Sequence, residues 1–119
     1  MLFFPMLSRD DIRRIALAQP EAYEAGHFGM PSFRVGKKIF CTIHQDQPRT
    51  MLKLDVEDQR NLAEDAPGVI EPVPGYWGRQ GSTFVWFEKI GEERFAELMR
   101  MAWVQVAPKR LISKFSSNA

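Results

Sequence analysis

The stretch HFGMPSFRVGKKIFCTIH, at residues 27–44, concentrates side chains that could do chemistry. It contains the single cysteine, Cys41, and both histidines of the chain, so a cysteine nucleophile with a histidine base is one arrangement to weigh. It also contains Arg34, Lys37 and Lys38, whose charges suit a phosphate backbone. The spacing of these residues within their strands decides between the two chemistries.

The pattern around Cys41 indicates packing rather than catalysis. Cys41 alternates with Ile39 and Ile43 on one face of a predicted strand, and reactive thiols need exposure and a positive neighbour. A closed metal site needs about four ligands, and no HxxxH, CxxC or EF-hand spacing is present. The acidic residues gather at predicted helix starts, where capping explains them. We therefore expect no catalytic residue, no metal and no cofactor, and a protein that is not an enzyme.

The basic residues favour contact with an anion. Alternation with Val35 turns Arg34 outward, and Lys37 and Lys38 lie at the tip of a hairpin whose turn begins at residue 36. If the loop after residue 78 lies beside that tip, Arg79 joins them in a small patch. Such a patch would bind phosphates weakly and with little sequence preference. The alternative is that these basic side chains are ordinary solvent-exposed charges of the sheet and bind nothing.

A glycine-rich segment, PGYWGRQGS at residues 74–82, forms a second region of interest. Its spacing is not GxGxxG and it does not follow a βαβ pattern, so a nucleotide site is not indicated. The glycines are expected to supply positive φ angles in a loop. Tyr76 and Trp77 would either stack on a base or anchor the loop in the core, and the pattern favours anchoring.

Hydrophobic periodicity places these residues on a two-layer α+β domain. The chain begins with a predicted helix that has acidic residues in its first turn. Apolar residues then recur with a period of two in the middle of the chain, and a strong helical stripe follows near its end. A mostly antiparallel sheet with helices on one face accommodates this order. We predict helices over 8–18, 56–65 and 92–106, strands over 32–35, 39–44, 52–54 and 83–87, a further strand over 23–28 and a short last helix after residue 108.

Length and composition are those of one domain over residues 1–119, with a tail at 116–119. With 45% hydrophobic residues, the chain can fold without a metal or a disulfide. The net charge of +1 is small for a dedicated nucleic-acid-binding domain. The apolar start has no basic residue before it and is interrupted by Pro5, unlike a signal peptide. We expect a cytoplasmic protein with no membrane partner.

Five segments in order resemble the MmcQ/YjbR family of small bacterial proteins. The resemblance implies a compact two-layer fold similar to secretion-chaperone-like folds. It also implies a DNA-binding label, since two hairpins resemble paired wings, and it implies no reaction, cofactor or catalytic residue. The segments are FGMPSFRVGKKIFC at 28–41, MLKLD at 51–55, a glutamine at 59, PGYWG at 74–78 and AWVQVAPKRL at 102–111.

Residues and resemblance together predict a non-enzymatic binding module. The predicted partner is nucleic acid, DNA in particular, contacted through Arg34, Lys37, Lys38 and Arg79 with Trp77 stacking on a base. The alternative is a protein-interaction or adaptor domain, dimeric through a sheet face, with no role in nucleic-acid binding.

Overall fold

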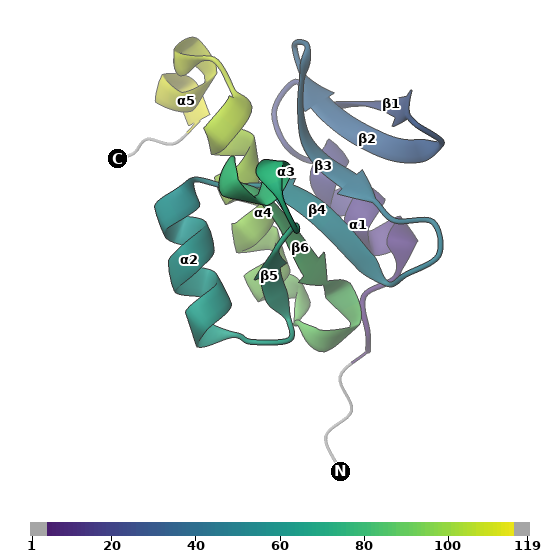
Figure 1. The fold of residues 1–119 in the computed structure, drawn as a ribbon. Helices are drawn as coiled ribbons and strands as arrows, with labels where there is room; N and C mark the ends of the chain where they lie inside the picture. The colour runs from purple at the N-terminus through teal and green to yellow at the C-terminus, as the bar shows by residue number, and fades with distance from the viewer. Residues whose placement is uncertain (1–4, 116–119) are drawn as a thin grey trace.

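The computed structural model describes residues 5–115, so the predicted tail at 116–119 lies outside the described residues (Figure 1). The predicted α+β class is confirmed. The elements, in chain order, are α1 (Arg9–Leu17), β1 (Tyr23–His27), β2 (Met30–Val35), β3 (Lys38–Ile43), β4 (Arg49–Lys53), α2 (Val56–Asp65), β5 (Ile70–Pro72), α3 (Tyr76–Arg79), β6 (Ser82–Trp86), a 3₁₀ turn η1 (Phe87–Lys89), α4 (Glu92–Val106) and α5 (Lys109–Phe115).

The strands form one antiparallel sheet in the order β1-β2-β3-β4-β6-β5. The first four strands follow one another as a meander, and β6 then inserts between β4 and β5. That interior position explains why the β6 sequence is apolar on both faces. Of the residues described, no helix is long and apolar enough to cross a membrane.

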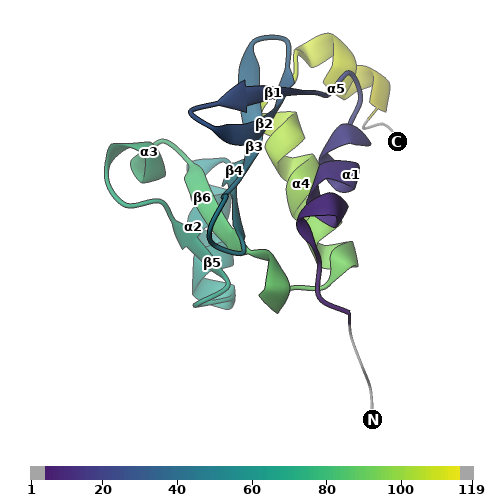
Figure 2. The ribbon, with the colours of Figure 1, turned by 90° about the vertical axis from the view of Figure 1, so that its right-hand side faces the viewer.

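The two faces of the sheet are covered differently. Figure 2 shows α1 and α4 together on one face, while α3 and the β1–β2 turn project on the opposite side. We call the first the covered face and the second the open face. Phe33, Cys41, Ile43 and Leu52 lie on the covered face and are buried.

Cys41 is buried as predicted, and it makes no disulfide. Burial raises the pKa of its thiol far above the ordinary value, because the thiolate would lose its hydration. A cysteine nucleophile is therefore excluded as the chemistry of residues 27–44.

The helical stripe of α4 packs against the sheet as its spacing indicates. Phe95, Leu98, Met99 and Trp103 are fully buried. The indole Nε1 of Trp103 donates to the carbonyl oxygen of Pro20 at 2.9 Å, so the one polar atom of this side chain keeps a partner.

The starts of α1 and α2 are capped by the expected residues. Ser8 and Asp11 form a capping box at α1, in which the Ser8 N–H donates to the Asp11 carboxylate at 2.8 Å. The Asp55 carboxylate accepts from the N–H groups of Glu57 and Asp58 at the start of α2.

The prediction that Ile39 shares a strand face with Cys41, at the start of β3, is wrong. Phe33 pairs with Cys41 but Arg34 pairs with Ile39, so Phe40 is an extra residue in a β-bulge. Phe40 is consequently fully buried, whereas Ile39 is half-buried and lines a hollow on the open face. Simple alternation had grouped Ile39 with Cys41 because a bulge changes the phase without changing the hydrophobic pattern.

The segment from residue 70 to residue 82 has more structure than predicted. It contains the edge strand β5 and the single turn of α3. Gly75 and Gly81 have φ angles of 83° and 107°, as expected for turn glycines. Gly78 has a different role, because a Cβ there would lie 1.7 Å from the Val73 carbonyl oxygen. Glycine at 78 therefore permits close packing of α3 on the preceding chain.

Candidate functional site

Lys37 and Lys38 are exposed at the turn between β2 and β3. In both views this turn lies beside α5, at the same end of the molecule (Figures 1 and 2). The Tyr23 hydroxyl donates to the Gly36 carbonyl, which ties the start of β1 to the turn. We call the turn and α5 together the basic end. It contains Lys37, Lys38, Lys109, Arg110 and Lys114, and neither segment contains an acidic residue.

One carboxylate from outside these segments contacts the basic end. Glu21 pairs with Arg110 at 3.1 Å, and this guanidinium holds the pKa of the Glu21 carboxyl below its usual value, with a smaller effect from Lys114. Lys37, Lys38, Lys109 and Lys114 form no ion pair among the described residues, so they remain available to an outside anion.

Arg34 points toward the open face, as predicted, but its guanidinium is used within the sheet. Its Nε donates to the Ser32 hydroxyl at 3.1 Å and one Nη donates to the Gly26 carbonyl at 3.2 Å. The bond to Ser32 stays within β2, and the bond to Gly26 joins β2 to the edge strand β1. Arg34 therefore does not extend freely beside Lys37 and Lys38.

Trp77 and Arg79 lie on α3, away from the β2–β3 turn in both views (Figures 1 and 2). The interpretation of Trp77 as a core anchor is wrong, because 65% of its surface is exposed. Gly78, and not the aromatic pair, is the buried residue of this turn. Arg79 is exposed and borders a hollow next to α2. The structure therefore separates the predicted site residues into different places.

The open face contains a hollow of about 690 Å³ that sequence reasoning did not predict. Apolar and aromatic side chains make most of its wall, and its size is within the roughly 300–1,000 Å³ typical of small-molecule sites. The β1–β2 turn and α3 stand on its two sides. It is lined by His27, Phe28, Met30, Ile39, Thr42, His44, Arg49, Thr50, Met51, Lys53, Val73, Trp77, Ser82 and Phe84.

Arg49 and Lys53 are the two cations that line the hollow. The Lys53 ammonium donates to the Gln80 carbonyl oxygen, which leaves Arg49 as the cation without a hydrogen-bond partner in the described chain. The Arg49 guanidinium carbon lies 3.9 Å from the ring centre of Phe84 and 5.3 Å from that of Trp86, which holds it by cation–π contacts. Its Nε is buried and has no hydrogen-bond partner, and no carboxylate of the described chain pairs with it. Glu71, on the same face, accepts from the Trp86 indole at 3.0 Å and does not line the hollow.

His44 adds a hydrogen-bond donor beside Arg49. Its Nδ1 accepts from the backbone N–H groups of Asp46 and Gln47 at 3.0 and 2.9 Å. In the neutral ring the proton therefore sits on Nε2, which is left as the donor. The His44 backbone N–H donates to the Arg49 carbonyl at 3.0 Å, so the two residues are neighbours across the β3–β4 junction.

Phe28 occupies a costly backbone position on the rim of the hollow. With Gly29 it forms a two-residue turn in which both φ angles are positive, 51° and 80°. Glycine adopts this conformation easily, whereas a bulky residue is strained in it. The side chain is 92% exposed, so burial does not offset the strain.

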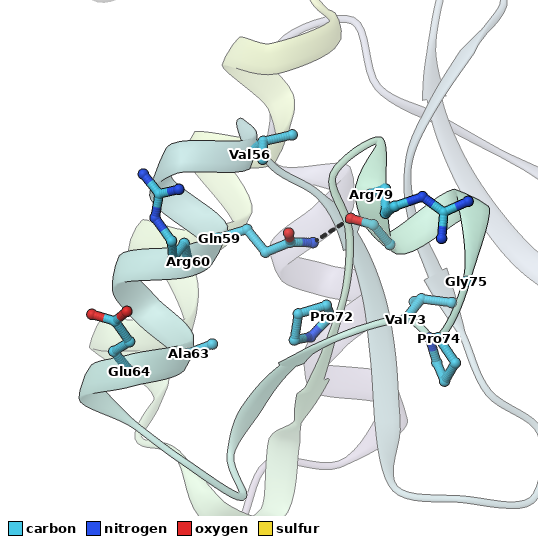
Figure 3. Close-up of a pocket in the computed structure, with 11 residues that line it drawn as sticks. Val56, Gln59, Arg60, Ala63, Glu64, Pro72, Val73, Pro74, Gly75 and Arg79 are labelled. Carbon is cyan, nitrogen blue, oxygen red and sulfur yellow. Dashed lines mark hydrogen bonds between the residues drawn. The ribbon is translucent and has the colours of Figure 1, made fainter.

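A second hollow, next to α2, has a structural role. Figure 3 shows Gln59 reaching from α2 toward the α3 segment, while Arg60 and Glu64 point away. The Gln59 amide donates to the carbonyl oxygens of Gly78 and Ser82 at 3.0 Å. The Gln59 amide thus joins α2 to the turn that carries Trp77. Figure 3 shows no group of polar side chains pointing together into this hollow among the residues it labels.

The hollow was not predicted from the sequence because its residues come from five separated segments, at 27–30, 39–44, 49–53, 73–77 and 82–84. Only the order of residues in β4 gave a signal: Arg49, Met51 and Lys53 alternate with buried Thr50 and Leu52. That alternation indicates one uncovered face carrying two cations.

Comparisons with known proteins agree with this fold. The model of the YjbR family matches residues 17–105. A crystal structure of the Deinococcus radiodurans protein DR2400, described as a DUF419 domain, is similar with a TM-score of 0.71 and 25% sequence identity. The match covers 98% of this chain and 86% of that one. No curated protein matches the sequence.

Proposed function

The chain belongs to the YjbR family, and from that premise we propose that it is a non-enzymatic module that binds nucleic acid weakly through its basic end. The observation that carries the proposal is that the turn with the exposed Lys37 and Lys38 lies beside α5, whose Lys109, Arg110 and Lys114 are also exposed (Figure 1). Exposed cations on a turn and a helix can reach a phosphate backbone without reading base edges.

The binding is expected to be weak and tolerant of sequence. Few phosphates can be neutralised at once, and the whole chain has a net charge of only +1. Nonspecific complexes of this kind have dissociation constants of roughly 10⁻⁴–10⁻⁶ M at physiological salt, and the weaker part of that range is expected here.

The test is a titration of labelled duplex and single-stranded DNA at several salt concentrations. The Lys37→Gln/Lys38→Gln variant should bind less tightly, and the slope of log affinity against log salt should fall by about one for each lysine that contacts a phosphate. The matched control is Arg60→Gln/Lys89→Gln, which removes the same charge outside the basic end. No binding by wild type at low salt, or equal losses in both variants, would contradict the proposal.

A protein-interaction role is the second candidate, favoured by the uncovered open face with its exposed Phe28 and Trp77. Self-association through that face would appear as a rise in sedimentation coefficient with protein concentration. The rise should disappear in the Phe28→Asn/Trp77→Ser variant. A concentration-independent monomer would argue against a homodimer.

A further inference from the structure

We infer that the open-face hollow is a binding site for a small aromatic anion: a flat apolar body that carries one carboxylate or phosphate group. This site is separate from the basic end, so the inference does not depend on the proposed nucleic-acid binding. It rests on the charge of Arg49, on the donor of His44 and on the aromatic side chains at the rim.

Arg49 determines the charge of the ligand. A guanidinium in a largely apolar hollow without a carboxylate partner loses hydration and gains no ion pair, which is unfavourable unless an anion arrives. Its stacking on Phe84 and Trp86 fixes the plane of the guanidinium before a ligand binds. A fixed planar fork of donors matches the two oxygens of a carboxylate or phosphate.

The β3–β4 junction holds this charged end of the hollow in place. Arg9 donates from its guanidinium to the carbonyl oxygens of His44 and Gln47, at 3.1 and 2.8 Å. The Nδ1 of His44 accepts from the same turn, so its Nε2–H is directed by the backbone and not by solvent. Arg49 and His44 can therefore present donors to one anionic group without reorganisation.

The remaining walls determine the shape of the ligand. Met30, Ile39 and Met51 give an apolar floor, and the rings of Phe28 and Trp77 stand at the rim. Aromatic rings prefer offset-stacked or edge-to-face contacts with another ring, so a flat ligand gains more from this rim than a branched aliphatic one. The strain at Phe28 is consistent with a side chain kept at the rim for contact and not for stability.

The experiment uses 1-anilinonaphthalene-8-sulfonate, an aromatic anion whose fluorescence rises in apolar sites, with the intact chain. Saturable binding at one site per chain is expected. Naphthalene-2-carboxylate should displace the probe at least about tenfold better than 2-naphthylmethanol, which has the same ring and no charge, because charge-assisted hydrogen bonds are lost. Equal competition by the two compounds would overturn the inference, and so would the absence of saturable binding.

The same fluorescence measurement on substituted variants tests whether the probe binds in the open-face hollow. Arg49→Gln should weaken probe binding by about ten- to a hundredfold, with partial recovery in Arg49→Lys, whereas Arg60→Gln on α2 should have no effect. If Arg49→Gln does not fold, the competitor pair with wild type and Arg49→Lys still decides the question. Unchanged binding in a folded Arg49→Gln variant would refute the assignment.

Two further arms distinguish the source of the anion. A nucleoside monophosphate that competes as well as naphthalene-2-carboxylate would identify a phosphate ligand, and failure to compete would identify a carboxylate; either result supports the site. Displacement of the probe by single-stranded oligonucleotide but by neither small anion would overturn the small-ligand inference while leaving the basic-end proposal intact.

Discussion

On the covered face of the sheet, Phe33 and Leu52 are fully enclosed by α1 and α4, whereas on the open face Met51 and Phe84 of the same or adjacent strands stay half-buried. The period of two along a strand lets one backbone serve both surfaces. The covered face provides apolar burial, which is the main source of stability. The open face leaves a hollow with an unpaired cation, which contributes little to stability. Substitutions on the two faces should therefore separate folding from binding.

The largest effect is expected on the covered face. Trp103→Ala should lower the free energy of unfolding by about 3–5 kcal/mol, since a large buried aromatic and its hydrogen bond to Pro20 are lost. Trp77→Ala is the matched control on the open face and should change stability by less than about 0.5 kcal/mol. Chemical denaturation monitored by circular dichroism measures both free energies of unfolding. Equal changes in the two variants would contradict the separation of a stabilising covered face from an open face that adds little stability.

A smaller loss is expected where α2 holds the turn that carries Trp77. Gln59→Leu keeps the volume but leaves the carbonyl oxygens of Gly78 and Ser82 without this donor, at a cost of about 1–3 kcal/mol. Asn61→Leu, at an exposed position of the same helix, is the control and should be close to neutral. If the midpoints of both variants coincide with wild type, the Gln59 hydrogen bonds do not hold α3.

A pH-dependent effect is expected at the rim of the covered face. The hydrogen bonds from Ser8, with help from Arg14, lower the pKa of Asp11. A lowered folded-state pKa stabilises the fold above the unfolded-state value, and this contribution disappears as the pH falls through the folded-state value. Asp11→Asn should therefore be less stable than wild type at about pH 7 and nearly equal at about pH 2.

Thermal unfolding across that pH range checks the Asp11 prediction, with Asp10→Asn as the neighbouring control. Asp10 takes no part in the capping box. A gap between Asp11→Asn and wild type that widened on acidification would have the wrong sign.

The smallest change in stability is expected at the rim of the open face. Phe28→Asn places a residue that tolerates positive φ in the β1–β2 turn, so stability should stay equal or rise by less than about 1 kcal/mol. Binding of the aromatic anion should weaken in the same variant. Phe33→Ala, on the covered face of the same hairpin, should instead cost about 3–5 kcal/mol. A destabilised Phe28→Asn would show that this side chain supports the fold.

The main elements were predictable because their hydrophobic periods are long and uninterrupted. The stripe of α4 and the alternation in β4 both appear in the structure. The three residues of β5 end in Pro72 and the single turn of α3 contains Gly78, so neither segment is long enough to show a period. Local pattern reading had no means of detecting them.

The hollow was less predictable than the fold. It depends on the approach of the β1–β2 turn and α3 across the open face, and this approach is a tertiary property (Figure 2). Trp77 was predicted to stack on a nucleic-acid base and not to line a hollow, and Arg49 was not predicted as a site residue, since a lone arginine on a strand resembles solvated charge. The exposure of Lys37 and Lys38 was predictable from the turn alone, whereas the position of α5 beside that turn was not.

The bulge at Phe40 also has a consequence for the exchange of amide hydrogens. A bulge interrupts the ladder between β2 and β3, so the outer end of this hairpin can open while Cys41 and Ile43 remain paired. Amides at Lys38 and Ile39 should therefore exchange with solvent faster than those at Cys41 and Ile43. Lys37 and Lys38 would then lie on a segment that opens locally many times for each unfolding of the sheet.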